Sequence, residues 1–105
     1  MIARIWTGAT RERDSETYLD YLNRTGVEEC RSTPGNRGVF VLRRVEGGRA
    51  EFLFLSLWES WQAIEAFAGK DRDKAVYYDE DAAFLLKMEP RVRHFEVAVA
   101  PPGVA

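Results

Sequence analysis

Apolar and polar residues recur along the chain with two periods, one typical of β-strands and the other of α-helices. β-branched and aromatic runs predict strands, and apolar residues recurring every three to four positions predict helices. The expected order is a strand at 2–7, a helix from Asp14 or Ser15 to Gly26, a loop at 30–36, strands at 39–45 and 52–58, a helix from Ser60 to Gly69, helical turns at 74–78 and 82–88, and a strand at 93–100. Gly47-Gly48 suits the tight hairpin between the second and third strands.

This order predicts an α+β protein of the ferredoxin-like type. Two βαβ crossovers around a hairpin form a split βαβ unit, with a four-stranded antiparallel sheet and helices on one face. The strand at 52–58 is apolar or aromatic except at Ser56, which indicates burial on both of its faces. Because the helices cover only one face, a second copy of the chain is expected to cover the other in a two-fold dimer. The alternative is a monomer whose sheet face is less apolar.

The composition places the chain among ordinary globular proteins. Its 105 residues fit one domain at 1–100 followed by a short tail at 101–105. The net charge is -2 and the charges are interleaved, which argues against nucleic acid as a partner. Cys30 is the single cysteine, and there is neither a signal-peptide pattern nor a membrane-spanning apolar run. We therefore expect a cytoplasmic protein without a membrane partner.

The segment from Phe54 to Phe67 carries the most specific pattern. It is an apolar strand that ends in Trp58, followed by Glu-Ser and an amphipathic helix with an aromatic residue near its end, and a Pro34-Gly35 turn precedes the second strand. This pattern resembles the antibiotic biosynthesis monooxygenase family over about residues 1–100. The resemblance implies a dimeric α/β barrel. That family includes cofactor-independent monooxygenases of polyketide quinones, haem-degrading enzymes, proteins that process small aldehydes or quinols, and chains without a known activity.

The resemblance also bears on haem. Haem-degrading members place an Asn on the first strand, a Trp near the end of the helix that follows the motif, and a haem-ligating His beyond it. The matching positions here hold Trp6 or Thr7, Phe67 and Tyr77, and the only histidine, His94, lies on the last strand. The resemblance therefore implies a protein that works without haem, metal or organic cofactor.

A cofactor-free monooxygenase needs an apolar cleft for an electron-rich aromatic molecule and donors that stabilise its anion. The candidate catalytic residues are Tyr77, His94 and Arg4, and the candidate substrate-binding residues are Trp6, Tyr18, Trp58, Trp61, Phe67 and Tyr78.

Each candidate also has a purely structural interpretation. These are core packing with a locally paired indole for Trp58, core packing for Phe67, partial exposure for Trp61, an interface position for Tyr77, an ion pair with Glu96 for Arg4 and a solvent-exposed ring for His94.

Other polar groups point to no chemistry. The acidic stretch around Asp71, Asp73 and 79–81 matches no calcium loop and is interpreted as a solvated helix cap. Cys30 is expected to be a packing residue. The leading hypothesis is a monooxygenase that acts on a small aromatic or quinol-type molecule, and the alternative is a non-catalytic dimeric binding or interaction domain. An open cleft reached by Tyr77, Arg4 or Trp6 favours the enzyme, and one filled by Trp58, Phe67 and Phe84 favours the alternative.

Overall fold

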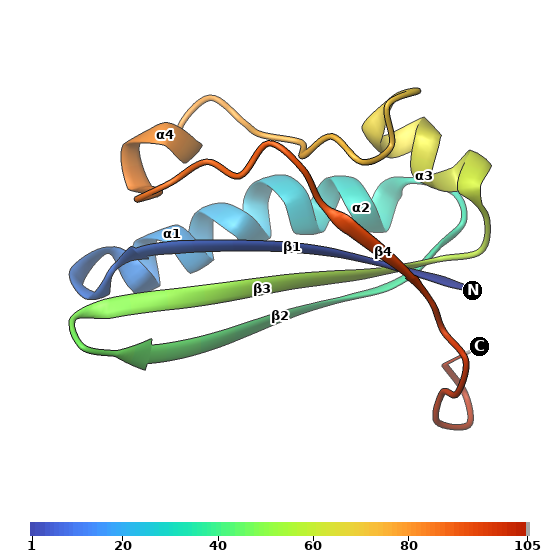
Figure 1. The fold of residues 1–105 in the computed structure, drawn as a ribbon, viewed down its shortest axis with the longest axis horizontal. Coiled ribbons are helices and arrows are strands. Elements are labelled where there is room, and N and C mark those ends of the chain that lie inside the picture. Colours follow the sequence, from blue (N-terminus) through green and yellow to red (C-terminus); the bar gives the residue numbers. More distant parts are fainter. Residues whose placement is uncertain (105) are drawn as a thin grey trace.

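The computed structural model describes residues 1–104, so the expected tail at 101–105 includes one position, Ala105, outside the described residues. The elements follow the order β1 (Ile2–Arg11), η1 (Glu12–Asp14), α1 (Ser15–Leu22), η2 (Asn23–Val27), α2 (Glu28–Ser32), β2 (Asn36–Glu46), β3 (Arg49–Trp58), α3 (Trp61–Ala68), α4 (Asp81–Phe84) and β4 (Arg93–Glu96) (Figure 1).

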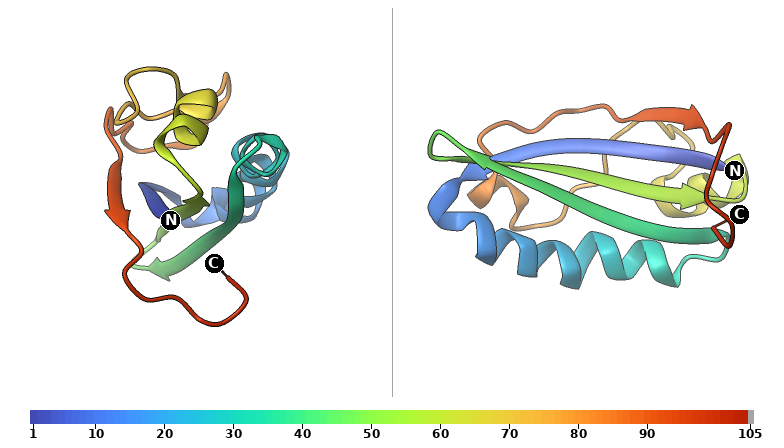
Figure 2. Two further views of the ribbon diagram at one scale, coloured as in Figure 1. Left: turned by 90° about the vertical axis from the view of Figure 1, so that its right-hand side faces the viewer. Right: turned by 90° about the horizontal axis from the view of Figure 1, so that it is seen from below.

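The four strands form one antiparallel sheet in the order β2-β3-β1-β4. The helices and the segment before β4 lie on one side of this sheet (Figures 1 and 2). This is the split βαβ arrangement, so the ferredoxin-like α+β fold is confirmed. The hairpin between β2 and β3 turns at Gly47 and Gly48, whose φ angles are 61° and 78°, as predicted.

The core lies between the sheet and the helices. Alternate residues of β3 point to the helices, and Trp58 at its end is fully buried. The Trp58 indole N–H donates to Ser56 Oγ at 2.8 Å, and its ring stacks on Phe67 with 5.5 Å between ring centroids. Ser60 caps α3 by accepting from the N–H of Ala63, and Gly69 follows the last turn of α3.

Two strands differ in length from the prediction. β1 continues to Arg11, because residues 8–11 pair with 49–52 of β3 along the hairpin. β4 ends at Glu96 instead of residue 100, because Glu96 already pairs with Ile2, where β1 begins. No further strand residue is available there to pair with it.

The first helix does not end at Gly26. The chain passes through one π-helical stretch, η2, and continues in α2 to Ser32. A Cβ atom at Gly26 would lie 3.3 Å from the Phe54 ring, so glycine here serves the close approach of η2 to β3. Cys30 consequently lies in α2 and is fully buried, where burial raises the pKa of its thiol to about 12. The prediction of a loop beginning at Cys30 is therefore wrong.

The chain between α3 and β4 also differs from the prediction. We call residues 70–92 the covering segment, because they lie over the helix-bearing face of the sheet (Figure 1). Residues 74–78 are not helical, since the N–H of Ala75 donates to Pro90 O and the N–H of Val92 donates to Asp73 O. These bonds join the two ends of the segment. α4 is also shorter than expected, because the N–H of Leu86 leaves the helix to bond with Ala9 O.

The opposite face of the sheet is uncovered and apolar. The register places Phe40 beside Leu55 and Leu42 beside Leu53 on this face. Phe40 and Leu42 are each 52% exposed and Phe95 is 43% exposed. We call these side chains the open face. Within residues 1–104 no helix has the length and hydropathy needed to cross a membrane.

Candidate functional site

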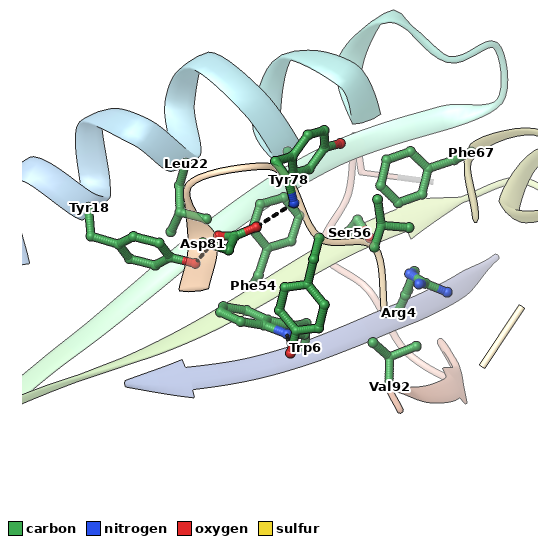
Figure 3. A pocket seen from close by; sticks show the side chains of 13 residues that line it. Arg4, Trp6, Tyr18, Leu22, Phe54, Ser56, Phe67, Tyr78, Asp81 and Val92 are labelled. Atoms are coloured by element: carbon green, nitrogen blue, oxygen red, sulfur yellow. Dashed lines mark hydrogen bonds between the residues drawn. The ribbon is translucent and has the colours of Figure 1, made fainter. Parts of the chain in front are cut away.

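A cavity of about 50 Å³ lies between the sheet, α1 and the covering segment (Figure 3). Most of its wall is aromatic, formed by Trp6, Phe54, Phe67, Tyr77 and Tyr78. Its polar groups are Arg4, Tyr18, Ser56 and Asp81. The walls therefore come from β1, β3, α1, α3 and the covering segment, which are far apart in the sequence.

Arg4 places a buried positive charge at one end of the cavity. The residue is only 4% exposed, and its guanidinium donates to the carbonyl oxygens of Arg72 and, at 2.8 Å, Lys74. Its third neighbour is His94 Nε2 at 3.2 Å. Burial lowers the pKa of Arg4, but an arginine side chain remains protonated. The expected ion pair with Glu96 is wrong, because the register places Glu96 opposite Ile2.

His94 lies behind Arg4 as seen from the cavity. Its side chain is 5% exposed, so the expected solvent-exposed ring is wrong. Because a guanidinium can only donate, Nε2 accepts from Arg4, and Nδ1 therefore carries the proton that it donates to Asp73 Oδ1 at 2.9 Å. Burial and the nearby charge of Arg4 lower the pKa of His94. This histidine is a neutral acceptor that holds the guanidinium in place.

The lowered pKa of His94 leads to a pH-dependent stability. In the unfolded chain the imidazole takes up a proton near its ordinary pKa of 6.5, whereas the folded chain takes it up only at lower pH. The unfolded state thus binds more protons below pH 6.5, and the free energy of unfolding falls as the pH falls. We expect the wild-type melting temperature to decrease between pH 7 and pH 5 more steeply than that of His94→Gln. Equal slopes would contradict this assignment.

Tyr77 connects the covering segment to β1. The indole N–H of Trp6 donates to the Tyr77 hydroxyl at 3.1 Å, and this hydroxyl donates to Glu89 O at 2.6 Å. The two rings meet edge to face, with 6.2 Å between centroids. Burial raises the pKa of Tyr77. Tyr77 therefore fixes the orientation of the Trp6 ring in the cavity wall and stays protonated at neutral pH.

Asp81 is a site residue that sequence analysis missed. Its carboxylate accepts from the Tyr18 hydroxyl at 2.8 Å and from the N–H of Tyr78 at 2.7 Å, and the residue is 3% exposed. The interpretation of this aspartate as part of a solvated cap is wrong. No local pattern distinguishes Asp81 from its acidic neighbours Asp79 and Glu80, because only the packing of α4 against Tyr18 turns it inward.

The tyrosines beside Asp81 are also bonded. The Tyr78 hydroxyl donates to Glu29 Oε2 at 2.8 Å, at the surface. Burial raises the pKa of both Tyr18 and Tyr78.

The structure brings six of the sequence-derived candidates to the cavity, namely Arg4, Trp6, Tyr18, Phe67, Tyr77 and Tyr78. Three others lie outside its wall. Trp58 belongs to the core, and His94 stands behind Arg4. Trp61 is 39% exposed and carries the Arg72 guanidinium 4.1 Å from its ring centroid. The deciding groups Tyr77, Arg4 and Trp6 thus reach a cavity, but Phe67 narrows it.

The residues around the cavity do not fit a haem. Trp6, Phe67 and Tyr77, which match the haem-site positions of the resemblance, all line it. However, about 50 Å³ holds a few water molecules, far less than a porphyrin. The Tyr77 oxygen already bonds to two partners, and both nitrogens of His94 are engaged. Within residues 1–104 no group of three or more His, Cys, Asp or Glu side chains is arranged to hold a metal ion.

No protein-family model and no curated protein matches the chain, but solved structures do. A Nitrosomonas europaea protein provisionally named an antibiotic biosynthesis monooxygenase is 14% identical, with a TM-score of 0.68, over 94% of this chain and 100% of its own. The haem degrader MhuD of Mycobacterium tuberculosis, with two haems bound, is 19% identical, with a TM-score of 0.59, over 96% and 99%. A further Mycobacterium tuberculosis structure is 17% identical, with a TM-score of 0.53, over 97% of both chains. The chain therefore has the fold of the antibiotic biosynthesis monooxygenases.

Proposed function

We propose that the chain is a cofactor-independent, monooxygenase-like protein that acts on an electron-rich aromatic or quinol-type molecule. The observation that carries this proposal is the buried Arg4 guanidinium at the end of an aromatic-walled cavity. The partners that Arg4 contacts directly, two carbonyl oxygens and a neutral imidazole, carry no net negative charge. Asp73 is reached only through His94.

The charge of Arg4 favours a substrate anion. In a site with little water, a fixed cation stabilises a phenolate or enolate more strongly than it would in bulk water. Such an anion is the form of an electron-rich aromatic that reacts with oxygen. Trp6 and Phe67 supply apolar surface for the ring, and the Tyr77 hydroxyl holds Trp6 in place. The chain thus contributes binding, orientation and charge stabilisation, which is what this chemistry requires of a protein.

The reaction balances without an external reductant. The deprotonated carbon of a methylene group next to the aromatic system adds to molecular oxygen and forms a hydroperoxide after protonation. Loss of water then leaves a carbonyl, so CH2 and O2 become C=O and H2O. The substrate supplies all four electrons, one oxygen atom enters the product and the other leaves as water.

Oxygen uptake tests the proposal directly. The full chain, treated with a chelator, is incubated with a panel of anthrone-like and quinol substrates in an oxygen-electrode cell. We expect substrate-dependent uptake above the spontaneous rate, with one product oxygen derived from labelled O2. Uptake no faster than the spontaneous rate across the panel would contradict the proposal.

The volume of the cavity requires Tyr78 to move when a ring binds. Benzene occupies a protein cavity of about 150 Å³, which is larger than the 50 Å³ found here. Tyr78 lies over the cavity, and its hydroxyl is held only by the surface bond to Glu29 (Figure 3). An outward rotation of its ring would open the cavity at the cost of this one bond.

Replacing Tyr78 by alanine is therefore expected to tighten the binding of phenol by up to about tenfold, because the ring no longer has to break its hydrogen bond and leave. Calorimetric titration measures the effect. Tyr78→Phe is the matched control. It removes only the hydroxyl, and a smaller gain is expected because its ring still fills the space. Unchanged affinity in Tyr78→Ala would show that Tyr78 does not gate the cavity.

The small cavity also favours a second candidate, a non-catalytic dimeric binding or interaction domain. Both candidates include a homodimer, because the open face exposes Phe40, Leu42 and Phe95 in a single copy. Large exposed apolar patches mark interfaces, and a two-fold partner would present the same patch in return.

Light scattering is expected to give twice the chain mass of 12.0 kDa. Leu42→Glu, which puts a charge into the proposed interface, is expected to shift the protein to a monomer. Arg44→Glu, on the same strand, reverses a charge that is already exposed and serves as the control. A wild-type monomer at every concentration would contradict the dimer.

A further inference from the structure

Asp81 and Arg4 lie at opposite ends of the same cavity, with its aromatic wall between them (Figure 3). Asp81 belongs to α4 beside Tyr18, and Arg4 belongs to β1 beside His94. Both residues are at least nine-tenths buried. The cavity therefore has one negative and one positive end.

Neither charge meets an opposite charge directly. In the part of the chain that the structure describes, no Lys, Arg or His nitrogen lies within 4.0 Å of the Asp81 carboxylate, and no carboxylate lies within this distance of Arg4. Asp81 is held by two neutral donors, the Tyr18 hydroxyl and the N–H of Tyr78. Burying a charge without an opposite partner costs folding free energy. Groups of this kind are found mostly at functional sites.

Asp81 retains the capacity to bind a ligand. A carboxylate can accept about four hydrogen bonds, and one bond to each oxygen is present here. A hydroxyl in the cavity can therefore donate to Asp81, whereas an oxyanion beside it would be repelled. At the other end Arg4 favours an oxyanion over a hydroxyl. The two ends thus select different forms of the same functional group.

We propose that the cavity binds a small dihydroxylated aromatic ring as its monoanion, in one orientation. The neutral hydroxyl donates to Asp81 and the ionised oxygen faces Arg4. This inference rests on the proposed function and names its substrate class, a single-ring quinol. Asp81 is then a specificity-determining residue that requires a hydrogen-bond donor at the far end of the ring.

Two ligands that differ only in this donor test the inference. Hydroquinone has a hydroxyl at the position where 4-methoxyphenol has a methyl ether. Binding of each to the full-length protein is measured by calorimetric titration without oxygen. We expect hydroquinone to bind about 10- to 100-fold more tightly, which corresponds to one hydrogen bond to a charged group. Its ultraviolet difference spectrum is expected to show the phenolate form. Equal affinities, or no binding of either ligand at millimolar concentration, would overturn the inference.

Two variants assign the preference to the carboxylate. Asp81→Asn keeps the size and a carbonyl acceptor but removes the charge, so the preference for hydroquinone is expected to fall by about tenfold, because hydrogen bonds to neutral groups are about half as strong. Tyr18→Phe keeps the carboxylate, removes one of its donors and is expected to retain the preference. It remains informative if Asp81→Asn does not fold. An unchanged preference in Asp81→Asn, or its loss in Tyr18→Phe, would overturn the inference.

Oxygen uptake separates this inference from the proposed function. Uptake with quinols together with equal binding of the two ligands would overturn the role of Asp81 and leave the monooxygenase proposal standing. A clear binding preference without uptake would support the two-ended site and favour the binding domain over the enzyme.

Discussion

Arg4→Met is expected to slow oxygen consumption with a responsive substrate by about 100- to 1000-fold, which is the usual effect of removing one group that stabilises a developing oxyanion. Methionine approximates the length of the arginine side chain but carries no charge, so the cavity would lose its positive end. The initial rate of oxygen uptake at saturating substrate measures the effect. Because Arg4 stabilises the anion, we expect kcat to fall more than the affinity for a neutral ligand.

Arg4→Lys is the control for charge. It keeps the positive charge but not the planar guanidinium that reaches Lys74 O and His94 together, so an intermediate rate is expected. Thermal melting of both variants identifies any loss of activity that comes from unfolding, since Arg4→Met also leaves the carbonyls of Arg72 and Lys74 without this donor. A folded Arg4→Met protein with the wild-type rate would remove Arg4 from the mechanism.

Trp58→Ala is expected to lower the free energy of unfolding by about 3–5 kcal/mol, as large-to-small substitutions of core aromatic residues do. The side chain is fully buried at the end of β3 and stacks on Phe67. Its removal would leave a cavity and would also deprive Ser56 Oγ of its donor. Urea denaturation followed by circular dichroism measures the change.

Trp61→Ala provides the matched comparison, because the two tryptophans are three positions apart. Trp61 is 39% exposed and contacts Arg72 at the surface. Its replacement is expected to cost about 1 kcal/mol, the range of an exposed cation–π contact. Similar losses for the two variants would show that Trp58 is not the anchor of this core.

Local signals in the sequence were sufficient for the architecture. The hairpin at Gly47-Gly48, the cap at Ser60 and the stop at Gly69 depend on the conformation of a few neighbouring residues. The apolar run of β3 and its turn to Trp58 likewise reflect periods of two residues within one strand. These features predicted the order of strands and helices, the ferredoxin-like sheet and the apolar open face.

The partners of the site residues depended instead on contacts between distant positions. Arg4 contacts His94, 90 residues away, and Asp81 meets Tyr18 across 63 residues. Helix and strand periods carry no information about such pairs, so Glu96 was assigned to Arg4 and Asp81 was assigned to solvent.

The sequence by itself therefore determined the fold and the kinds of side chain that its helix-bearing face gathers, because both follow from local periodicity and turn chemistry. The tertiary structure alone decided which charges are buried and what they contact. The reason is that the covering segment has little regular structure, and its path is set by backbone bonds between its two ends and by packing against α1. Those long-range contacts turn Asp81 inward and surround Arg4 with carbonyl groups.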